Sequence, residues 1–144
     1  MSTELSAGEL AAYFALRRAG DRLQRAVTGH LRDLGLTEVQ FSVLAQLGES
    51  PDGIGMSDLA HRLVVTKSGL TYQAGQLESR GLVNRTADLD DDRAVRLRLT
   101  ADGAELLARA LPAHIALVRE LFIDRMTPTQ LAVLREALTH VAAD

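Results

Sequence analysis

One segment of this 144-residue chain alternates apolar and polar side chains, whereas its neighbours have the periodicity of helices. Within 94-AVRLRLT-100, the apolar Val95, Leu97 and Leu99 fall on one face of an extended strand and the arginines fall on the other. A period of two predicts a half-buried β-strand. Together with residues 83–87, on the other side of an aspartate-rich stretch, it predicts a β-hairpin in an otherwise helical protein.

The other elements are predicted from apolar residues that recur at steps of three and four. The first expected helix spans 9–34, the second begins with the capping box Thr37–Gln40, and a short third is capped by Ser57. A fourth helix is expected over about 66–80. A long fifth helix is capped by Thr100 and kinked at Pro112, and the last begins at 127-TPTQ-130. Three central helices followed by a two-stranded ribbon describe a winged helix-turn-helix. The predicted fold class is therefore mainly α with a small β-hairpin wing.

The terminal segments, 9–34 and 101–144, are long and amphipathic. We expect a single domain, 1–144, in which the winged helix-turn-helix occupies 36–100. Such a small central module leaves little surface to cover the terminal helices. They are therefore expected to be dimerisation helices that pack against a second copy in a two-fold homodimer.

Composition excludes several classes of function. The chain has no cysteine, so it offers no disulfide framework, no cysteine zinc site and no thiol redox sensor. The sequence lacks a phosphate-binding loop and a nucleophile elbow, and its four histidines are scattered, so neither an enzyme nor a cofactor is expected. With no signal peptide and no apolar run of membrane-spanning length, a cytoplasmic protein without a membrane partner is expected.

The aspartates before the alternating strand suggest a calcium loop at first reading. Asp88, Asp90 and Asp92 match positions 1, 3 and 5 of the EF-hand pattern, which then requires glycine at position 6 and glutamate at position 12. This chain has Arg93 and Leu99 there. A guanidinium group would repel the cation, so no metal site is expected.

The fourth predicted helix has one face that differs from an ordinary solvent-exposed surface. Leu70, Ala74 and Leu77 share an arc that must face the core. The opposite arc and its flanks carry Lys67, Ser68, Thr71, Tyr72, Gln73, Gly75, Gln76 and Ser79. Gly75 lowers helix stability by about 1 kcal/mol relative to alanine, so the close approach of another surface would explain it. Amide and hydroxyl side chains suit a DNA major groove, although an unremarkable exposed face is an equal alternative on these residues alone.

The chain resembles the multiple-antibiotic-resistance regulator (MarR) family of bacterial transcription factors in three motifs. They are 36-LTEVQFSVLAQL-47, 57-SDLAHRLVVTKSGLTYQAGQLESRGLVNR-85 and 91-DDRAVRLRLTADG-103. The resemblance covers about 36–104 in detail and the terminal helices in layout. It implies a homodimer that binds double-stranded DNA at a pseudo-palindromic operator, usually as a repressor. It also implies a small anionic or phenolic effector that alters the spacing of the two DNA-reading helices.

The same resemblance assigns DNA-binding roles by position. Lys67, Ser68, Thr71, Tyr72, Gln73 and Gln76 would lie in or beside the major groove, and Arg93 would enter the minor groove at the wing tip. Asp91 would brace that arginine through an ion pair. Asp92 departs from the family, which often has a basic residue there. The acidic tip and the neutral helix leave an alternative open, a winged-helix module that binds another protein and has no operator.

We predict that Asp92→Arg raises affinity for DNA of any sequence and steepens its dependence on salt. The substitution adds a cation to the wing, where phosphate contacts release counterions. Fluorescence anisotropy at several salt concentrations measures the slope. An unchanged slope would mean that the wing tip lies away from the DNA backbone.

Overall fold

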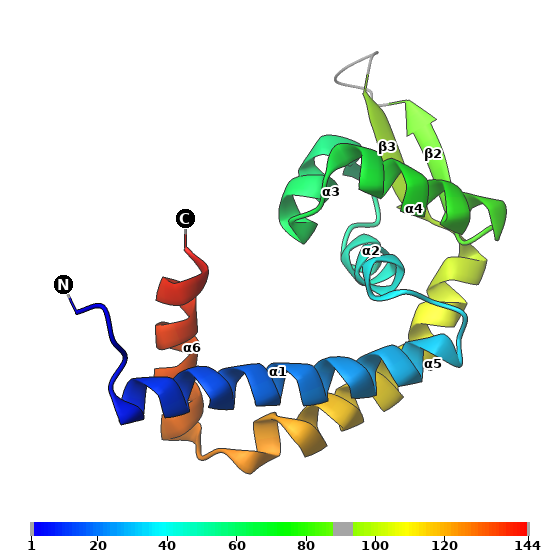
Figure 1. Ribbon diagram of the computed structural model, residues 1–144. Coiled ribbons are helices and arrows are strands. Elements are labelled where there is room, and N and C mark those ends of the chain that lie inside the picture. The colour runs from blue at the N-terminus through cyan, green and yellow to red at the C-terminus, as the bar shows by residue number, and fades with distance from the viewer. Residues whose placement is uncertain (1, 88–93, 144) are drawn as a thin grey trace. The chain divides into compact units, whose positions relative to one another are not determined.

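The chain divides into two units in the computed structural model, which describes residues 2–87 and 94–143 (Figure 1). The first, here called the central lobe, comprises His30–Pro112. The second, here called the terminal unit, combines Met1–Gly29 with Ala113–Asp144. Two long helices, α1 (Ala7–Arg32) and α5 (Ala101–Leu121), contribute to both units. The winged module expected at 36–100 falls within the central lobe.

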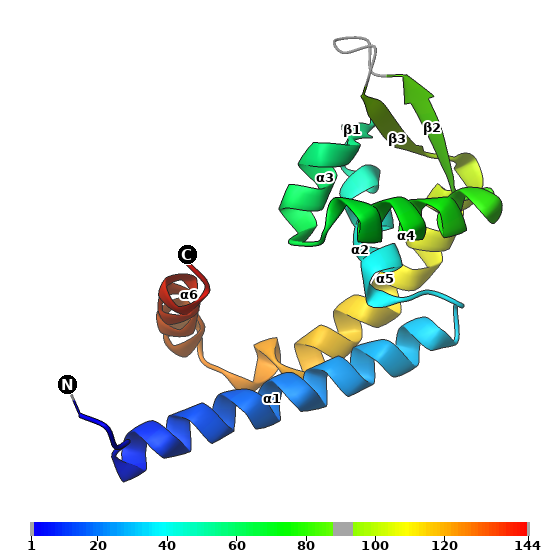
Figure 2. The same cartoon turned by 45° about the horizontal axis from the view of Figure 1, so that its top comes forward.

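The central lobe has the predicted order of helices and hairpin, with one strand, β1, that was not predicted. Its described elements are α2 (Glu38–Gly48), β1 (Ile54–Gly55), α3 (Met56–Leu63), α4 (Lys67–Ser79), β2 (Val83–Ala87) and β3 (Val95–Leu99), together with the ends of α1 and α5. The strands form an antiparallel sheet in the order β1-β3-β2. The ribbon of β2 and β3 extends beyond α4, on the side away from α2, which is the wing of a winged helix-turn-helix (Figures 1 and 2).

The core of the lobe forms where α2, α3, α4 and β3 bring their apolar faces together. Leu44, Leu59, Leu70 and Leu97, one from each of these elements, are all 0% exposed. The predicted alternation of β3 holds for Leu97 but not over the whole strand. Val95 was expected on the same buried face and is 38% exposed, because it lies at the end of the ribbon that extends beyond α4.

Side-chain caps define several helix starts as predicted. Thr37 and Gln40 form a complete capping box at α2, and Thr127 and Gln130 form another at α6 (Pro128–Ala142). Thr100 Oγ1 accepts a hydrogen bond from the Gly103 backbone N–H at 3.0 Å, which caps α5. These residues satisfy N–H groups that a helix start leaves without intrahelical partners.

The prediction for the start of α3 is wrong. Ser57 was expected to cap this helix, but the N-cap is Gly55 and Ser57 lies inside the first turn. Ile54 and Gly55 pair with Leu97 and Arg96 of β3, so the chain passes directly from a strand into the helix. A strand of two residues is too short to produce an alternating pattern, and the surrounding glycines and proline read as a turn.

Pro112 lies inside α5, which continues without a break from Ala101 to Leu121. The kink expected at Pro112 stays a prediction. The division between the central lobe and the terminal unit nevertheless falls directly after Pro112.

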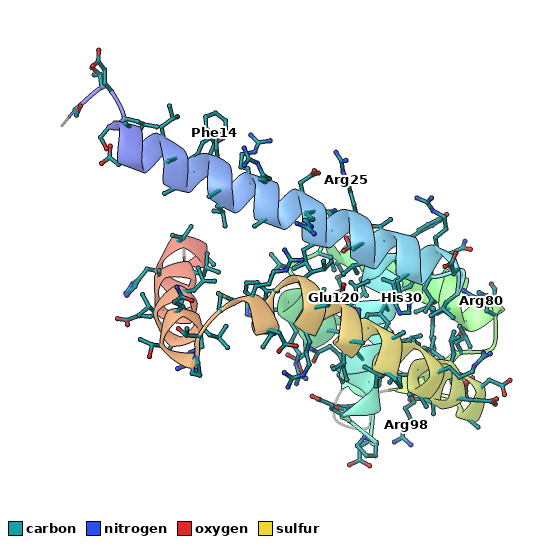
Figure 3. The ribbon with its side chains drawn as sticks, turned by 90° about the horizontal axis from the view of Figure 1, so that it is seen from below. Phe14, Arg25, His30, Arg80, Arg98 and Glu120 are labelled. Carbon is teal, nitrogen blue, oxygen red and sulfur yellow. The ribbon has the colours of Figure 1, made fainter. Side chains whose placement is uncertain are left out.

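The terminal unit leaves apolar side chains exposed in the single chain. Its elements are the first part of α1, the last part of α5, the short 3-10 helix η1 (Ile123–Arg125) and α6. None of the described residues of α6 is buried, and Val141 is 73% exposed. On α1, Phe14 is 53% exposed and projects away from α6 (Figure 3). Among residues 2–87 and 94–143, no helix combines the length and apolar character needed to cross a bilayer.

Val64 closes the turn between α3 and α4 in a conformation that β-branched residues rarely adopt. It is the C-cap of α3, with φ 55° and ψ 48°, in the left-handed region. This conformation costs roughly 1–2 kcal/mol for an L-residue. The side chain is 90% exposed, so burial recovers little of that cost. The turn is therefore strained at this position.

We predict that Val64→Gly raises the free energy of unfolding by about 0.5–1 kcal/mol, since relief of strain exceeds the added freedom of glycine in the unfolded chain. Urea denaturation measures it. The matched control is Gly81→Ala, because Gly81 has φ 73° and open space where a Cβ would lie. Alanine there should destabilise through the backbone alone. A Val64→Gly protein no more stable than the wild type would show that the turn holds no strain.

Candidate nucleic-acid interface

Helix α4 separates a buried face from an exposed one, as the helical wheel predicts. Leu70, Ala74 and Leu77 are each 0% exposed, whereas Tyr72 is 66% exposed. The exposed residues of the helix include Lys67, Ser68, Thr71, Tyr72, Gln76 and Ser79. The structure therefore brings five of the predicted DNA-binding residues onto one accessible surface.

Hydroxyl groups in the first turns of α4 make hydrogen bonds within the helix, and these bonds determine what each group can offer to an outside partner. Thr66 caps the helix by accepting a hydrogen bond from the Gly69 N–H at 3.0 Å, and its Oγ1 lies 3.4 Å from the Ser68 Oγ. Thr71 Oγ1 donates its proton to the Lys67 carbonyl at 2.8 Å. The Thr71 hydroxyl therefore keeps only its oxygen lone pairs for an outside partner, and it offers an acceptor.

Gln73 lies on the flank of the exposed face and is half-buried against α2. Its Oε1 accepts a hydrogen bond from Gln40 Nε2 at 2.9 Å, and Gln40 is only 8% exposed. A bidentate contact with adenine uses both the oxygen and the nitrogen of a glutamine amide. The Gln73 oxygen already has a protein partner, so the Gln73 amide has a different hydrogen-bonding environment from the Gln76 amide.

Arg85 of β2 belongs to this site and was not among the predicted residues. Its Nη2 donates to the Thr71 carbonyl at 3.3 Å, and its Nε lies 3.5 Å from a carboxylate oxygen of Glu78. The guanidinium group also lies beside Gly75, where a Cβ would be 3.5 Å from Nη2. That distance is an ordinary contact, so Arg85 does not force a glycine there. The only sequence signal for Arg85 was its place at the end of the second family motif.

A groove of about 730 Å³ lies beside the exposed face of α4, between the start of α3, the start of α4 and β3. The described residues that line it include four cations, Arg62, Lys67, Arg85 and Arg96, and one carboxylate, Asp58. Arg62 pairs with that carboxylate at 2.9 Å. The groove thus concentrates positive charge locally, although the whole chain has a formal net charge of −3.

The remaining predicted residues lie between β2 and β3 in the sequence. Arg93 and Asp91 lie outside the described residues, as do Asp88, Asp90 and Asp92, so their predicted roles stay predictions. Within residues 2–87 and 94–143, no group of three or more acidic or histidine side chains is placed to hold a metal ion.

Comparisons with known proteins agree with this geometry. The MarR family model matches residues 36–95. The HTH-type transcriptional repressor Rv2887 of Mycobacterium tuberculosis is 30% identical over 131 residues, which cover 91% of this chain and 93% of that protein. Sco3205, a MarR family transcriptional regulator from Streptomyces coelicolor solved in complex with DNA, is 32% identical with a TM-score of 0.92, covering 99% of this chain and 90% of that one.

A third similar protein was solved with a small molecule. CouR from Rhodococcus jostii, bound to p-coumaroyl-CoA, is 28% identical with a TM-score of 0.82, covering 98% of this chain and 96% of that one. The resemblance found in the sequence motifs is thus confirmed over almost the full length of the chain. This protein belongs to the MarR family of transcriptional regulators.

Proposed function

We propose that this protein is a dimeric repressor that binds a pseudo-palindromic operator through α4 and responds to a small effector. The observation that carries the proposal is the exposed, neutral hydrogen-bonding face of α4 beside a groove lined by cations. Bases are distinguished by hydrogen bonds in the major groove, and the register on the duplex is set by phosphate contacts. The winged helix-turn-helix, which we assign to 36–100, offers side chains of both kinds on one side.

Individual residues on this face suit different contacts. The side chain of Gln76 is exposed and has no hydrogen-bond partner in the described part of the chain, so both its amide atoms are available to an adenine edge. Thr71 offers an acceptor, and Ser68 lies in the first turn. Lys67 and Arg85 line the cationic groove and suit phosphates. Tyr72 is exposed enough to reach a phosphate or a thymine methyl group.

The wing supplies the second part of the proposed contact. β2 and β3 form a paired ribbon from Val83–Leu99 to Ala87–Val95. Membership of the family supports placing Arg93 in the minor groove, where narrow A·T-rich DNA concentrates negative potential. Asp91 would orient that guanidinium group.

The exposed apolar surface of the terminal unit supports the proposal of a homodimer. An apolar groove of about 670 Å³ runs along α6 and is lined by residues that include Phe122, Leu131, Leu134 and Leu138. A single chain leaves this surface in water, whereas a two-fold partner would cover it. We therefore assign 9–34 and 101–144 to dimerisation, and the dimer presents two copies of α4 to the two half-sites of an operator.

A small anionic or phenolic effector is part of the proposal. It is supported by the family and by the p-coumaroyl-CoA bound to CouR. The proposed role requires no catalytic group and no cofactor. Since the proposed partner is operator DNA, we place the protein in the cytoplasm.

The proposal is tested by titrating the protein with the promoter region that flanks its own gene. Saturable binding with a dyad-symmetric footprint is the expected result. No preference over random DNA at moderate salt would contradict it and would favour a winged-helix module that binds another protein.

We predict that Gln76→Ala weakens operator binding by about 1–3 kcal/mol and spares binding to random DNA, because it removes a base contact and no phosphate contact. Fluorescence anisotropy with both DNAs measures the two affinities. Gln46→Ala, the same substitution on α2, is the matched control and should leave both affinities unchanged. An equal loss on operator and random DNA would show that Gln76 does not read bases.

A further inference from the structure

A chain of hydrogen bonds connects the start of α2 to α4. The Thr37 backbone N–H donates to Gln40 Oε1 at 3.1 Å, and Gln40 Nε2 donates to Gln73 Oε1 at 2.9 Å. A second bond, from the Gln40 backbone N–H to Thr37 Oγ1 at 3.1 Å, completes the capping box. Gln40 and Gln73 are 33 positions apart in the sequence, and the buried Gln40 amide links α4 to Thr37 at the start of α2.

The backbone N–H of Thr37 decides the orientation of both amides in this chain. A backbone N–H group can only donate, so the oxygen of the Gln40 amide must face Thr37 and its NH2 group must face α4. An NH2 group can only donate as well, so Gln73 must turn its oxygen towards Gln40. Reversing the Gln73 amide would place two donors face to face beside a side chain that is 8% exposed.

The NH2 group of Gln73 is consequently directed away from α2. It has no hydrogen-bond partner in the described part of the chain, and Gln73 is half-buried beside the exposed Tyr72. It also lies three residues before Gln76, so the two glutamines are neighbours on the helix surface. Gln76 can offer a donor and an acceptor, whereas Gln73 offers donors alone.

We propose that Gln40 acts as a positioning residue for DNA binding, by holding the Gln73 amide so that α4 presents only N–H donors to DNA at this position. The inference rests on the proposed function. The partner it selects is a hydrogen-bond acceptor, either a base atom such as guanine O6 or N7 or thymine O4, or a phosphate oxygen. Exocyclic amino groups of adenine and cytosine are rejected, because they too are donors.

The test compares Gln40→Met, Gln73→Met and the double variant on the operator and on a set carrying every single base-pair substitution. In Gln40→Met the Gln73 amide is free to rotate, so we expect discrimination at one base pair of each half-site to fall from about tenfold to within about threefold. Gln73→Met should lose the same discrimination. The double variant should lose no more than either single variant, because the two residues act as one unit.

The phosphate alternative gives a different pattern. If the acceptor is a phosphate oxygen, base preferences stay as in the wild type, while Gln40→Met and Gln73→Met weaken binding to operator and random DNA by the same factor. Either pattern, with non-additive effects of the two substitutions, supports the proposal.

A control and a second variant protect the test against an effect on folding. Gln46→Met makes the same replacement six residues further along α2 and should leave DNA binding unchanged. Gln40→Glu, measured at pH 8 to keep the carboxylate ionised, retains an oxygen for Thr37 and presents its second oxygen to Gln73. Gln73 should then turn its NH2 group towards α2 and its oxygen towards DNA. At the base pair where the wild type prefers a base that offers a hydrogen-bond acceptor, this variant should prefer a base that offers a donor. Urea denaturation of each variant reports stability separately.

Two outcomes would overturn the inference. In one, Gln40→Met and Gln40→Glu bind every DNA as Gln46→Met does. In the other, the effects of Gln40→Met and Gln73→Met simply add. If the wild type prefers its operator in these cases, the proposed function stands and only the role of Gln40 fails. If the wild type shows no preference for any DNA, the proposed function and this inference fail together.

Discussion

The complete burial of Leu70, Ala74 and Leu77 is the constraint on which the rest of the site depends. These side chains fix the rotation of α4 about its own axis, because turning the helix would bring apolar groups into water. β3 contributes to the same core through Leu97, which is also fully buried. Helix α4 and strand β3 of the wing are thus held by one packed core, and the polar face of α4 is what remains outside it.

Polar contacts brace α4 at places where the apolar core does not reach. On one flank Gln73 is bonded to Gln40 of α2, and on the other Arg85 of β2 reaches the Thr71 carbonyl and Glu78. At the C-terminal end, Arg80 Nη1 donates to the Gly35 carbonyl at 2.7 Å. A helix held on both flanks and at one end presents its outer side chains in defined positions, which direct readout of bases requires.

The features that could be predicted from the sequence are those that depend on local periodicity and capping. The buried face of α4 and the capping boxes at Thr37 and Thr127 follow from spacing within a few residues. Contacts between distant segments leave no such pattern, so the role of Arg85 and the bond from Gln40 to Gln73 could not be found. The strand at Ile54 was missed for a related reason, since its partner Leu97 is far away in the sequence. Arg93 and Asp91 remain predictions based on the family motif.

The net negative charge of the chain makes these fixed hydrogen bonds important. A formal net charge of −3 and a wing that carries Asp92 offer little non-specific attraction to a polyanion, and the cations near α4 are few. Three of them already have protein partners, since Arg62 pairs with Asp58, Arg85 pairs with Glu78, and Arg96 donates to the Gly53 carbonyl at 2.8 Å. Under the proposed function, selectivity comes from presenting donors and acceptors in a set arrangement, which reduces the ordering cost of binding. Weak general attraction then becomes an advantage, because random DNA competes less well with the operator.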